Sequence, residues 1–244
     1  MSALLPYTRQ LLALALVGMY LLDSVHWLSL GEAVVTTRRG ALRRLSCGSA
    51  FELGGRRPWL PNPLTPFWPE LRVLWLTRPG SGAGPAESAR QMRARAESLA
   101  LTGRFSAVCA AAVVAGAPLA LLAGREDVFL VCVLAGLLTT LTASGFLYAR
   151  RQALGLTRAQ WLSLTLTAVA CLPLSGNLAR AVARTRSWTL PAHGLAELEL
   201  TGSDAQQTRA QLLPVMRAAQ RYLPEDSPLA AALAEQLRQL EDST

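Results

Sequence analysis

The sequence contains no lysine, so all 24 of its Lys/Arg positions are arginine. A P-loop, a pyridoxal Schiff base and a kinase-type catalytic lysine each need an ammonium group, and the chain therefore excludes all three. The abundance of arginine, together with alanine, leucine, glycine and proline, is typical of a genome rich in G and C. It indicates a bacterial source.

Histidine and cysteine are also scarce. With only His26 and His193 in the chain, a multi-histidine metal site is excluded, and bis-histidine haem ligation in the membrane lacks its second ligand. No two of the four cysteines form a CxxC pair, so neither a disulfide framework nor a zinc site is indicated. No nucleophile elbow accompanies a possible Ser-His-Asp set. We therefore expect no metal, no cofactor and no catalytic residues.

Charged residues make up only 16% of the chain, whereas apolar residues make up 51% and gather in long runs. A water-soluble domain spaces its apolar residues at helix or strand period, because one face stays hydrated. Long uncharged runs instead suit hydrocarbon. We therefore expect a multi-pass integral protein of the bacterial cytoplasmic (inner) membrane, with an all-α core of about four transmembrane helices and the lipid bilayer as a partner.

The net charge of +8 does not indicate a nucleic-acid partner. The arginines cluster beside the apolar runs, where anionic lipid headgroups and membrane topology account for them. No recognisable nucleic-acid-binding motif accompanies them. We expect no nucleic acid among the partners.

Four apolar runs carry the predicted spans. The first lies in an N-terminal transmembrane segment at 1–30, and the other three lie within 105–186. Their bounds are Leu11–Leu30, Phe105–Gly124, Val128–Tyr148 and Trp161–Leu178.

The four runs differ in quality. No small-x-small cleavage site follows the first, so we interpret it as an uncleaved span, with a cleaved signal peptide as the alternative. The polar turn Arg125–Asp127 joins the second and third runs into a predicted helical hairpin. Pro173, Gly176 and Asn177 interrupt the fourth run, so a kinked or interfacial course is its alternative.

Residues 31–78 form a predicted β-meander module, because short β-prone pieces alternate there with turn signals such as Gly40 and Gly54-Gly55. Residues 79–104 are predicted as a flexible linker, RPGSGAGP, followed by a basic amphipathic helix. A helix of this kind before a span lies along the headgroups. The candidate headgroup contacts are Arg90, Arg93, Arg95 and Arg104.

Residues 187–244 are predicted as a soluble helical tail that forms an αα-hairpin. Ser203 and Gln206 resemble a capping box that opens a helix toward Tyr222, and Pro214 is expected to interrupt or bend this helix. Ser227 and Pro228 suit the start of the last helix. A leucine stripe follows at Leu229, Leu233, Leu237 and Leu240.

A proline-rich strip, PWLPNPLTPFWP, occupies 58–69, with prolines at every third residue from Pro63. Trp59, Phe67 and Trp68 are interleaved with these prolines and form a candidate partner or interface strip. The alternative, which we favour, is a stiff loop whose aromatic residues close the core of the β-meander.

Asp23 and His26 are a candidate intramembrane polar pair, because residues three apart share a helix face. Burying such a pair in hydrocarbon is costly, which suggests a proton relay or a contact with a polar partner helix. The simpler interpretation, which we favour, is that the span ends early and both side chains lie among headgroups, beside Trp27.

The arginine count gives conflicting answers about the membrane orientation. The count favours an outside N-terminus and a cytoplasmic β module when the loop between the first two runs is included. That loop exceeds the roughly 60 residues over which the rule holds, and without it the preference reverses. If the fourth run does not cross the membrane, the conflict disappears.

The function that we expect is that of a non-enzymatic accessory or assembly factor, which binds other membrane or membrane-associated proteins through its extramembrane segments. The alternative is a subunit of a small transporter or channel that uses Asp23 and His26. An intramembrane enzyme ranks last, since no catalytic motif was found.

Overall fold

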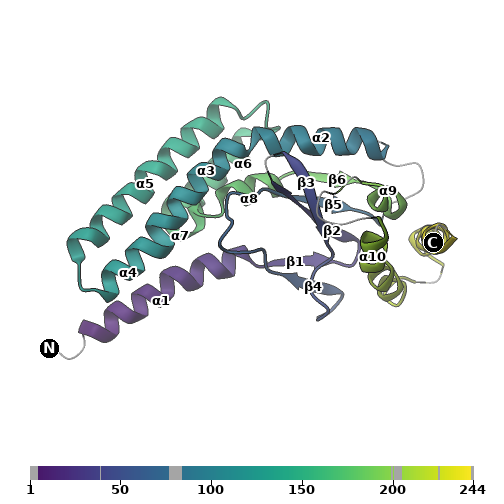
Figure 1. Cartoon of the computed structure of the whole chain (residues 1–244), viewed down its shortest axis with the longest axis horizontal. Coiled ribbons are helices and arrows are strands. Elements are labelled where there is room, and N and C mark those ends of the chain that lie inside the picture. Colours follow the sequence, from purple (N-terminus) through teal and green to yellow (C-terminus); the bar gives the residue numbers. More distant parts are fainter. Residues whose placement is uncertain are drawn as a thin grey trace. The chain divides into compact units, whose positions relative to one another are not determined.

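The computed structural model describes residues 5–38, 40–76, 84–198, 200, 205–224 and 226–242. The chain divides into two compact units (Figure 1). A helical unit comprises Met1–Val25, Pro61–Pro69 and Ser98–Thr185, and an α/β unit comprises His26–Leu60, Glu70–Glu97 and Arg186–Thr244. Each unit is thus assembled from three separate stretches of chain.

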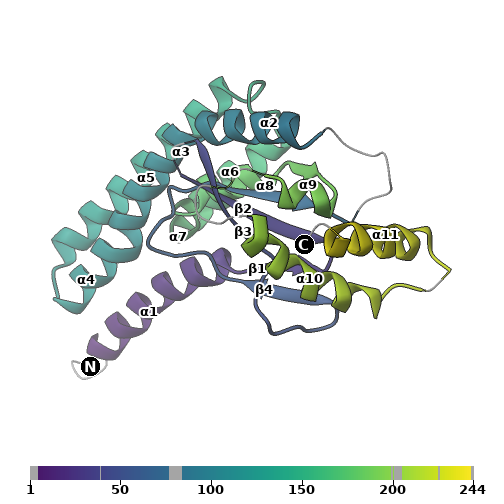
Figure 2. The same ribbon diagram turned by 45° about the vertical axis from the view of Figure 1, so that its right-hand side comes forward.

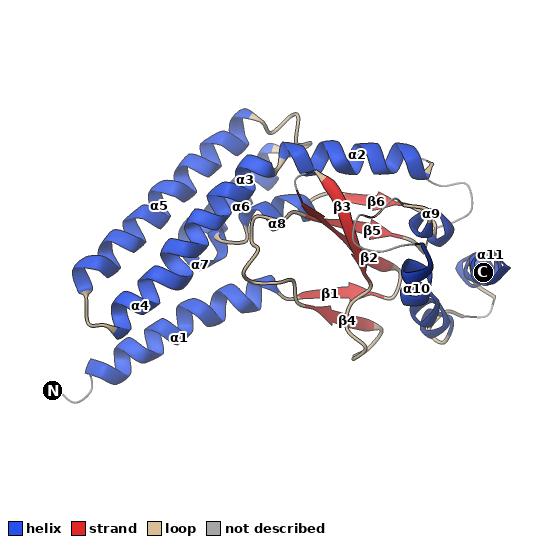
Figure 3. Cartoon of the chain, viewed as in Figure 1, coloured by secondary structure: helices blue, strands red, loops and turns tan. Residues whose placement is uncertain are grey.

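The helical unit contains a long first helix, a helical hairpin and a group of shorter helices (Figure 3). The elements are α1 (Leu5–Ser24), α3 (Ala100–Cys109), the π-helical segment η1 (Ala110–Gly116), α4 (Ala117–Leu122), α5 (Glu126–Ala149), α6 (Arg158–Ala170), α7 (Leu172–Ser175) and α8 (Leu178–Arg184).

The predicted helical hairpin is confirmed. The stretch Ala100–Leu122 is helical throughout and α5 packs against it. Gly124 ends the first arm with a positive φ of 69°. The N–H of Arg125 donates to the Ala120 carbonyl, and the N–H of Gly124 donates to the Leu121 carbonyl. This pair of bonds is a Schellman motif, which satisfies the last carbonyls of the helix.

Glycines allow the two arms of the hairpin to pack closely. A Cβ on Gly136 of α5 would overlap the Cγ2 atom of Val113, which is itself buried in η1. Nearby, the Cys109 thiol lies 3.5 Å from the Thr140 hydroxyl. Small residues at such a crossing let helix backbones approach closely without a polar driving force.

Within the described residues, two helices are long and apolar enough to cross a membrane, Ala100–Leu122 and Glu126–Ala149. The fourth run, 161–178, does not form one helix. It breaks after Ala170, and α7 begins with Pro173 in its first turn. Proline lacks the N–H that would bond to the preceding turn and is favoured in the first turn of a helix, which fits a new helix that begins here. The structure therefore does not support a complete span at 161–178. A core of four spans stays a prediction.

The α/β unit contains strands β1 (His26–Ser29), β2 (Glu32–Arg38), β3 (Ala41–Ser46), β4 (Arg56–Trp59), β5 (Glu70–Leu74) and β6 (Ser187–Thr189). β1 and β4 form a separate two-stranded ribbon. The main sheet has the order β3-β2-β5-β6.

The main sheet departs from the predicted meander at one edge. β2 pairs antiparallel with both β3 and β5, as short strands joined by turns predict. The fourth strand, β6, pairs parallel to β5, with Val73 opposite Trp188. The module therefore does not close within 31–78, because its last strand comes from a segment more than 100 residues later in the chain.

Helices complete the α/β unit: α2 (Pro85–Ser98), α9 (Ala192–Ala196), α10 (Ala205–Gln220) and α11 (Pro228–Asp242). At the place of the predicted C-terminal αα-hairpin, α10 packs on α11 (Figure 2). Ser227 caps α11, because its Oγ accepts from the Ala230 N–H at 3.0 Å. Pro214 does not interrupt α10. Ser203 and most of the linker at 79–84 lie outside the described residues.

Replacing Gly136 with leucine should loosen the hairpin, because the new side chain would occupy the position of Val113. We expect the free energy of unfolding to fall by about 1–3 kcal/mol, which is typical of an overpacked site. Gly145→Leu is the matched control in α5, since nothing lies within 4 Å of its Cβ position. Unfolding of both variants in detergent, followed by tryptophan fluorescence, measures the difference. Equal stabilities would contradict the close crossing at Gly136.

Candidate functional site

The loop Pro61–Pro69 is bound within the helical unit by two side chains. The Tyr20 hydroxyl of α1 donates to the Pro63 carbonyl at 2.6 Å. The Nη2 of Arg180, in α8, donates to the carbonyls of Asn62 and Thr65 at 2.7 and 3.0 Å. The proline-rich loop therefore belongs to the helices and is fixed through its backbone.

Arg180 has no exposed surface. A buried guanidinium is tolerated only when hydrogen bonds replace its hydration. Besides the two loop carbonyls, Arg180 donates through Nη1 to the Asn177 Oδ1 at 3.1 Å. The fixed fork of a guanidinium suits this arrangement of several acceptors better than a flexible ammonium would.

Asn177 extends this network to the end of α1. Its Nδ2 lies 3.2 Å from the Tyr20 carbonyl, 2.9 Å from the Ser24 hydroxyl and 3.0 Å from the Asp23 carboxylate. Asn177 itself is completely buried. The short helices α7 and α8 thus tie α1 and the proline-rich loop together.

The third helix meets the same loop at Gly103. A Cβ on this residue would lie 2.5 Å from the Phe67 carbonyl oxygen, a distance that backbone atoms cannot accommodate. Glycine is therefore required where α3 crosses the loop. Beyond this crossing the residues of α3 and η1 that face the loop are alanines and a valine.

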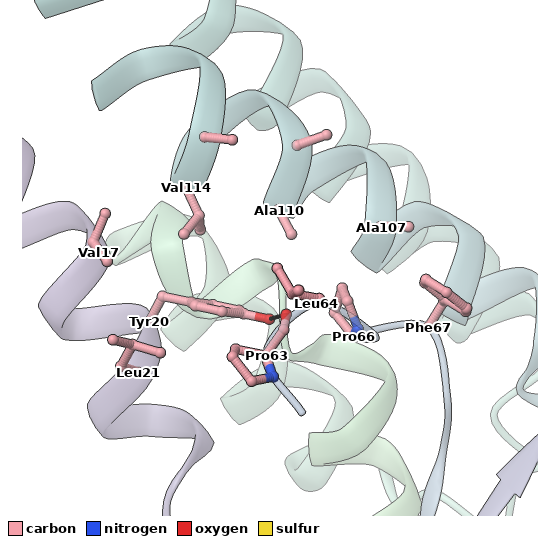
Figure 4. A pocket seen from close by; sticks show the side chains of 12 residues that line it. Val17, Tyr20, Leu21, Pro63, Leu64, Pro66, Phe67, Ala107, Ala110 and Val114 are labelled. Carbon is pink, nitrogen blue, oxygen red and sulfur yellow. Dashed lines mark hydrogen bonds between the residues drawn. The ribbon is translucent and has the colours of Figure 1, made fainter. Parts of the chain in front are cut away.

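A pocket of about 420 Å³ lies between α1, the loop and the α3–η1 helix (Figure 4). Its lining is apolar except for Tyr20, whose hydroxyl already bonds to Pro63. Its size lies in the range of about 300–1,000 Å³ that is usual for small-molecule sites. The lining residues are Val17, Tyr20, Leu21, Pro63, Leu64, Pro66, Phe67, Ala107, Ala110, Ala111, Val114 and Ala115.

The residues of the predicted aromatic strip divide between the two units. Trp59 lies in β4 of the α/β unit and stacks on His26, with ring centroids 6.0 Å apart. Phe67 and Trp68 lie in the helical unit and pack edge to face at 5.8 Å. A shared partner surface and the alternative of a core-closing loop both stay predictions.

The predicted Asp23–His26 pair on one helix face is wrong. α1 ends at Ser24, and His26 begins β1, so the period of three residues no longer applies. Asp23 contacts Asn177 instead. The Nε2 of His26 lies 3.8 Å from the buried Glu70 carboxylate.

The four candidate headgroup arginines have different surroundings. Arg90 is exposed and pairs with Glu87, Arg93 is half-buried, and Arg104 is exposed on α3. Arg95 is only 5% exposed, so it does not face headgroups. Burial, with a smaller contribution from Arg186, lowers the pKa of Arg95 to about 10, and the side chain stays charged at neutral pH.

No protein-family model, curated protein or solved structure matches this chain.

Nucleophilic and metal-binding groups do not gather in the described part of the chain. No cluster of three or more His, Cys, Asp or Glu side chains occurs among these residues. Burial raises the pKa of the Cys47 thiol to about 12, so this cysteine stays protonated at neutral pH.

Neither Arg180 nor Tyr20 was among the site residues predicted from the sequence. Arg180 follows an apolar run, where an arginine is ordinarily a signal of membrane topology. A signal was present, since Asn177 and Arg180 are three residues apart beside a broken span, where polar groups need partners. Arg180 donates to backbone carbonyls of the loop. Because every residue has a backbone carbonyl, no sequence pattern marks such acceptors.

Replacing Arg180 with methionine should release the proline-rich loop, because the carbonyls of Asn62 and Thr65 would lose their donor. We expect the free energy that holds the loop in place to fall by about 2–3 kcal/mol, which is typical of hydrogen bonds to a charged group. Limited chymotrypsin digestion in detergent measures the release as faster cleavage at Leu64 and Phe67. Arg158→Met is the control, since Arg158 is an exposed arginine of the same unit. Cleavage that is no faster than in this control would contradict the anchoring role.

Proposed function

We propose that this chain is an integral membrane protein that presents a single α/β module on one side of the bilayer and binds other proteins there as an accessory factor. The exposed apolar surface of the helical hairpin carries this proposal. Large apolar side chains on α5 are half or more exposed, including Leu130, Val131, Leu134 and Leu138. A continuous helix face of this kind is unfavourable in water and suits hydrocarbon.

The pairing of β5 with β6 supports a definite topology. Two strands can form a ladder only if they lie on the same side of the membrane. β5 precedes the hairpin and β6 follows α8, so the chain between them crosses an even number of times. The two arms of the hairpin supply two crossings. The fourth run then does not cross.

Hydrogen bonds within the helical unit support the same course for α6 to α8. The Trp161 indole, near the start of α6, donates to the Ser144 carbonyl toward the end of α5. The N–H of Ala179, in α8, donates to the Ser106 hydroxyl in the first third of the arm Ala100–Leu122, which begins with α3. The end of α5 and the start of α3 are the same end of the hairpin. The segment therefore enters and leaves at one side, as a re-entrant element buried against protein.

The charge distribution favours a cytoplasmic α/β module. At one end of the hairpin, Arg9 pairs with Glu126 at 2.6 Å and Arg125 pairs with Asp127 at 3.0 Å, so acids offset the arginines. The other end carries arginines close to the helix ends, without acidic neighbours in sequence. These are Arg104, Arg150, Arg151 and Arg158. An excess of arginine in short loops marks the cytoplasmic side.

The ribbon β1–β4 is the surface that best suits a protein partner. Trp27 on β1, Phe51 and Leu53 in the connection to β4, and Leu60 after β4 are all exposed, between 48% and 61%. Exposed aromatic and large aliphatic residues that gather on one element are typical of interaction sites. This set replaces the predicted strip of Trp59, Phe67 and Trp68.

The transporter alternative has less support, because it depended on Asp23 and His26 acting together. Asp23 contacts Asn177 at the end of α1, whereas His26 belongs to the ribbon of the α/β unit. The accessory role needs no such pair.

The membrane topology can be tested with single introduced cysteines in intact cells. Cysteines at Ala50 and Ala234, both exposed in the α/β unit, should resist a membrane-impermeant maleimide until the cells are lysed. A cysteine at Asp127, in the hairpin turn, should react in intact cells. Labelling is compared with the unsubstituted chain, and all forms should stay in the membrane pellet after alkaline carbonate extraction. Opposite labelling of the Ala50 and Ala234 positions would exclude the β5–β6 pairing, and release by carbonate would exclude membrane integration.

The partner surface can be tested by photo-cross-linking in the same cells. Benzoylphenylalanine at Leu53 should give a discrete cross-linked adduct, whereas the same residue at exposed Ala234 of α11 should not. Phe51→Ser should reduce the adduct, because it removes a neighbouring apolar contact. No adduct at Leu53, or an equal adduct at both positions, would argue against an accessory role through the ribbon.

A further inference from the structure

We propose that the pocket between α1, the proline-rich loop and α3–η1 binds one acyl chain of an anionic phospholipid, whose phosphate lies at Arg104. This inference rests on the proposed membrane location of the helical unit. It adds a specific lipid site, which is distinct from the general contact of the hairpin with the bilayer.

The chemistry of the lining fits a hydrocarbon chain. The sole polar side chain, Tyr20, uses its hydroxyl to bind the Pro63 carbonyl. The wall formed by α3 and η1 carries alanines at 107, 110, 111 and 115, which leave room beside the helix. An apolar cavity of this kind binds apolar ligands and gives water few partners.

The geometry of the helix places a charge at one end of the pocket. Arg104 precedes Ala107 by three residues and Ala111 by seven, so all three lie on one face of the helix. Arg104 is exposed. Phe67 and Ala107 lie at one end of the pocket and Val17 and Val114 at the other (Figure 4). Arg104 therefore extends the Phe67 end of the pocket.

The rise of the helix from Arg104 to Ala115 matches the depth of one leaflet. From Arg104 to Ala115 the helix rises by about 16 Å, at 1.5 Å per residue. The hydrocarbon core of one leaflet is about 15 Å deep, half of a core of about 30 Å. A phosphate at Arg104 thus places its acyl chain along the alanine wall.

The size of the pocket suits a single flexible chain. It measures about 420 Å³ and is lined by apolar side chains apart from Tyr20. An arginine at its end binds a phosphate strongly.

The experiment uses the full-length protein in phosphatidylcholine nanodiscs that contain a small fraction of a phosphatidylglycerol with a diazirine in its acyl chain. After photolysis, mass spectrometry compares labelling of the peptide that contains Ala107–Ala115 with labelling of the exposed face of α5 around Leu134. We expect excess label on the pocket peptide. A diazirine phosphatidylcholine should give about fivefold less excess, since one arginine near an anionic headgroup contributes about that factor.

Two pairs of variants make the test specific. Ala111→Phe fills the pocket and should lower its label about tenfold, the effect of displacing about two methylenes, whereas Val108→Phe, on the same helix but outside the lining, should not. Arg104→Gln should remove the preference for phosphatidylglycerol, whereas the exposed Arg158→Gln should retain it.

Each failure has a distinct meaning. Equal labelling of the pocket peptide and α5, unaffected by Ala111→Phe, would show ordinary boundary lipid and overturn the site while leaving membrane integration intact. Absence of label on both would overturn membrane integration itself. A pocket peptide that cross-links to another membrane protein in cell membranes, and is protected there from lipid label, would overturn the lipid assignment in favour of a partner helix.

Discussion

The parallel ladder between β5 and β6 is the constraint on which the topology depends. It brings together residues 72–74 and 187–189, although 112 residues and the whole hairpin separate them in sequence. Strand hydrogen bonds are short and directional, so they do not form across a bilayer. If the hairpin crosses twice, the ladder requires that the rest of the intervening chain returns to its starting side. The same ladder explains why three separate stretches of sequence build one α/β unit.

Arg180 and Asn177 connect the short helices α7 and α8 to the rest of the helical unit. In the proposed topology α6, with 13 residues and a length of about 20 Å, is too short to span about 30 Å of hydrocarbon. The irregular loop 61–69 has backbone carbonyls, which are costly to bury without donors. Arg180 supplies donors for two carbonyls of the proline-rich loop, and Asn177 contacts the end of α1. One buried cation and one amide thus connect three elements that have no regular hydrogen bonding with one another.

Local patterns in the sequence predicted much of the fold, and long-range partners accounted for the failures. The turn at Gly124, the hairpin, β2, β3, β5 and the C-terminal αα-hairpin each depend on residues within a few positions of one another, so periodicity and turn chemistry were sufficient. The strand β6 was missed because SWT is too short to have a pattern, and only its pairing with β5 makes it a strand. Asp23 and His26 were placed on one helix because the apolar run continues past Ser24, while the pairing of β1 with β4 ends the helix there. Arg95 was expected at headgroups, yet it is buried in α2, as are Met92 and Ala96.

The same loop that Arg180 anchors also explains why a pocket exists in a small helical unit. α1 packs on α4 and η1, at the far end of the α3–α4 helix from Gly103. Close to Gly103 the loop Pro61–Pro69 lies between α1 and α3, held to α1 by Tyr20 and to α3 by the contact of Phe67 with Gly103. Proline restricts the backbone of the loop, so it cannot collapse into the remaining space, and alanine side chains on η1 are too short to fill it. The π-helical segment η1 lies directly before Pro118. Proline has no backbone N–H, so a regular α-helix would lack one hydrogen bond at this position. A cavity at this position is therefore a consequence of how the loop is fixed, and its apolar lining is the basis of the proposed lipid site.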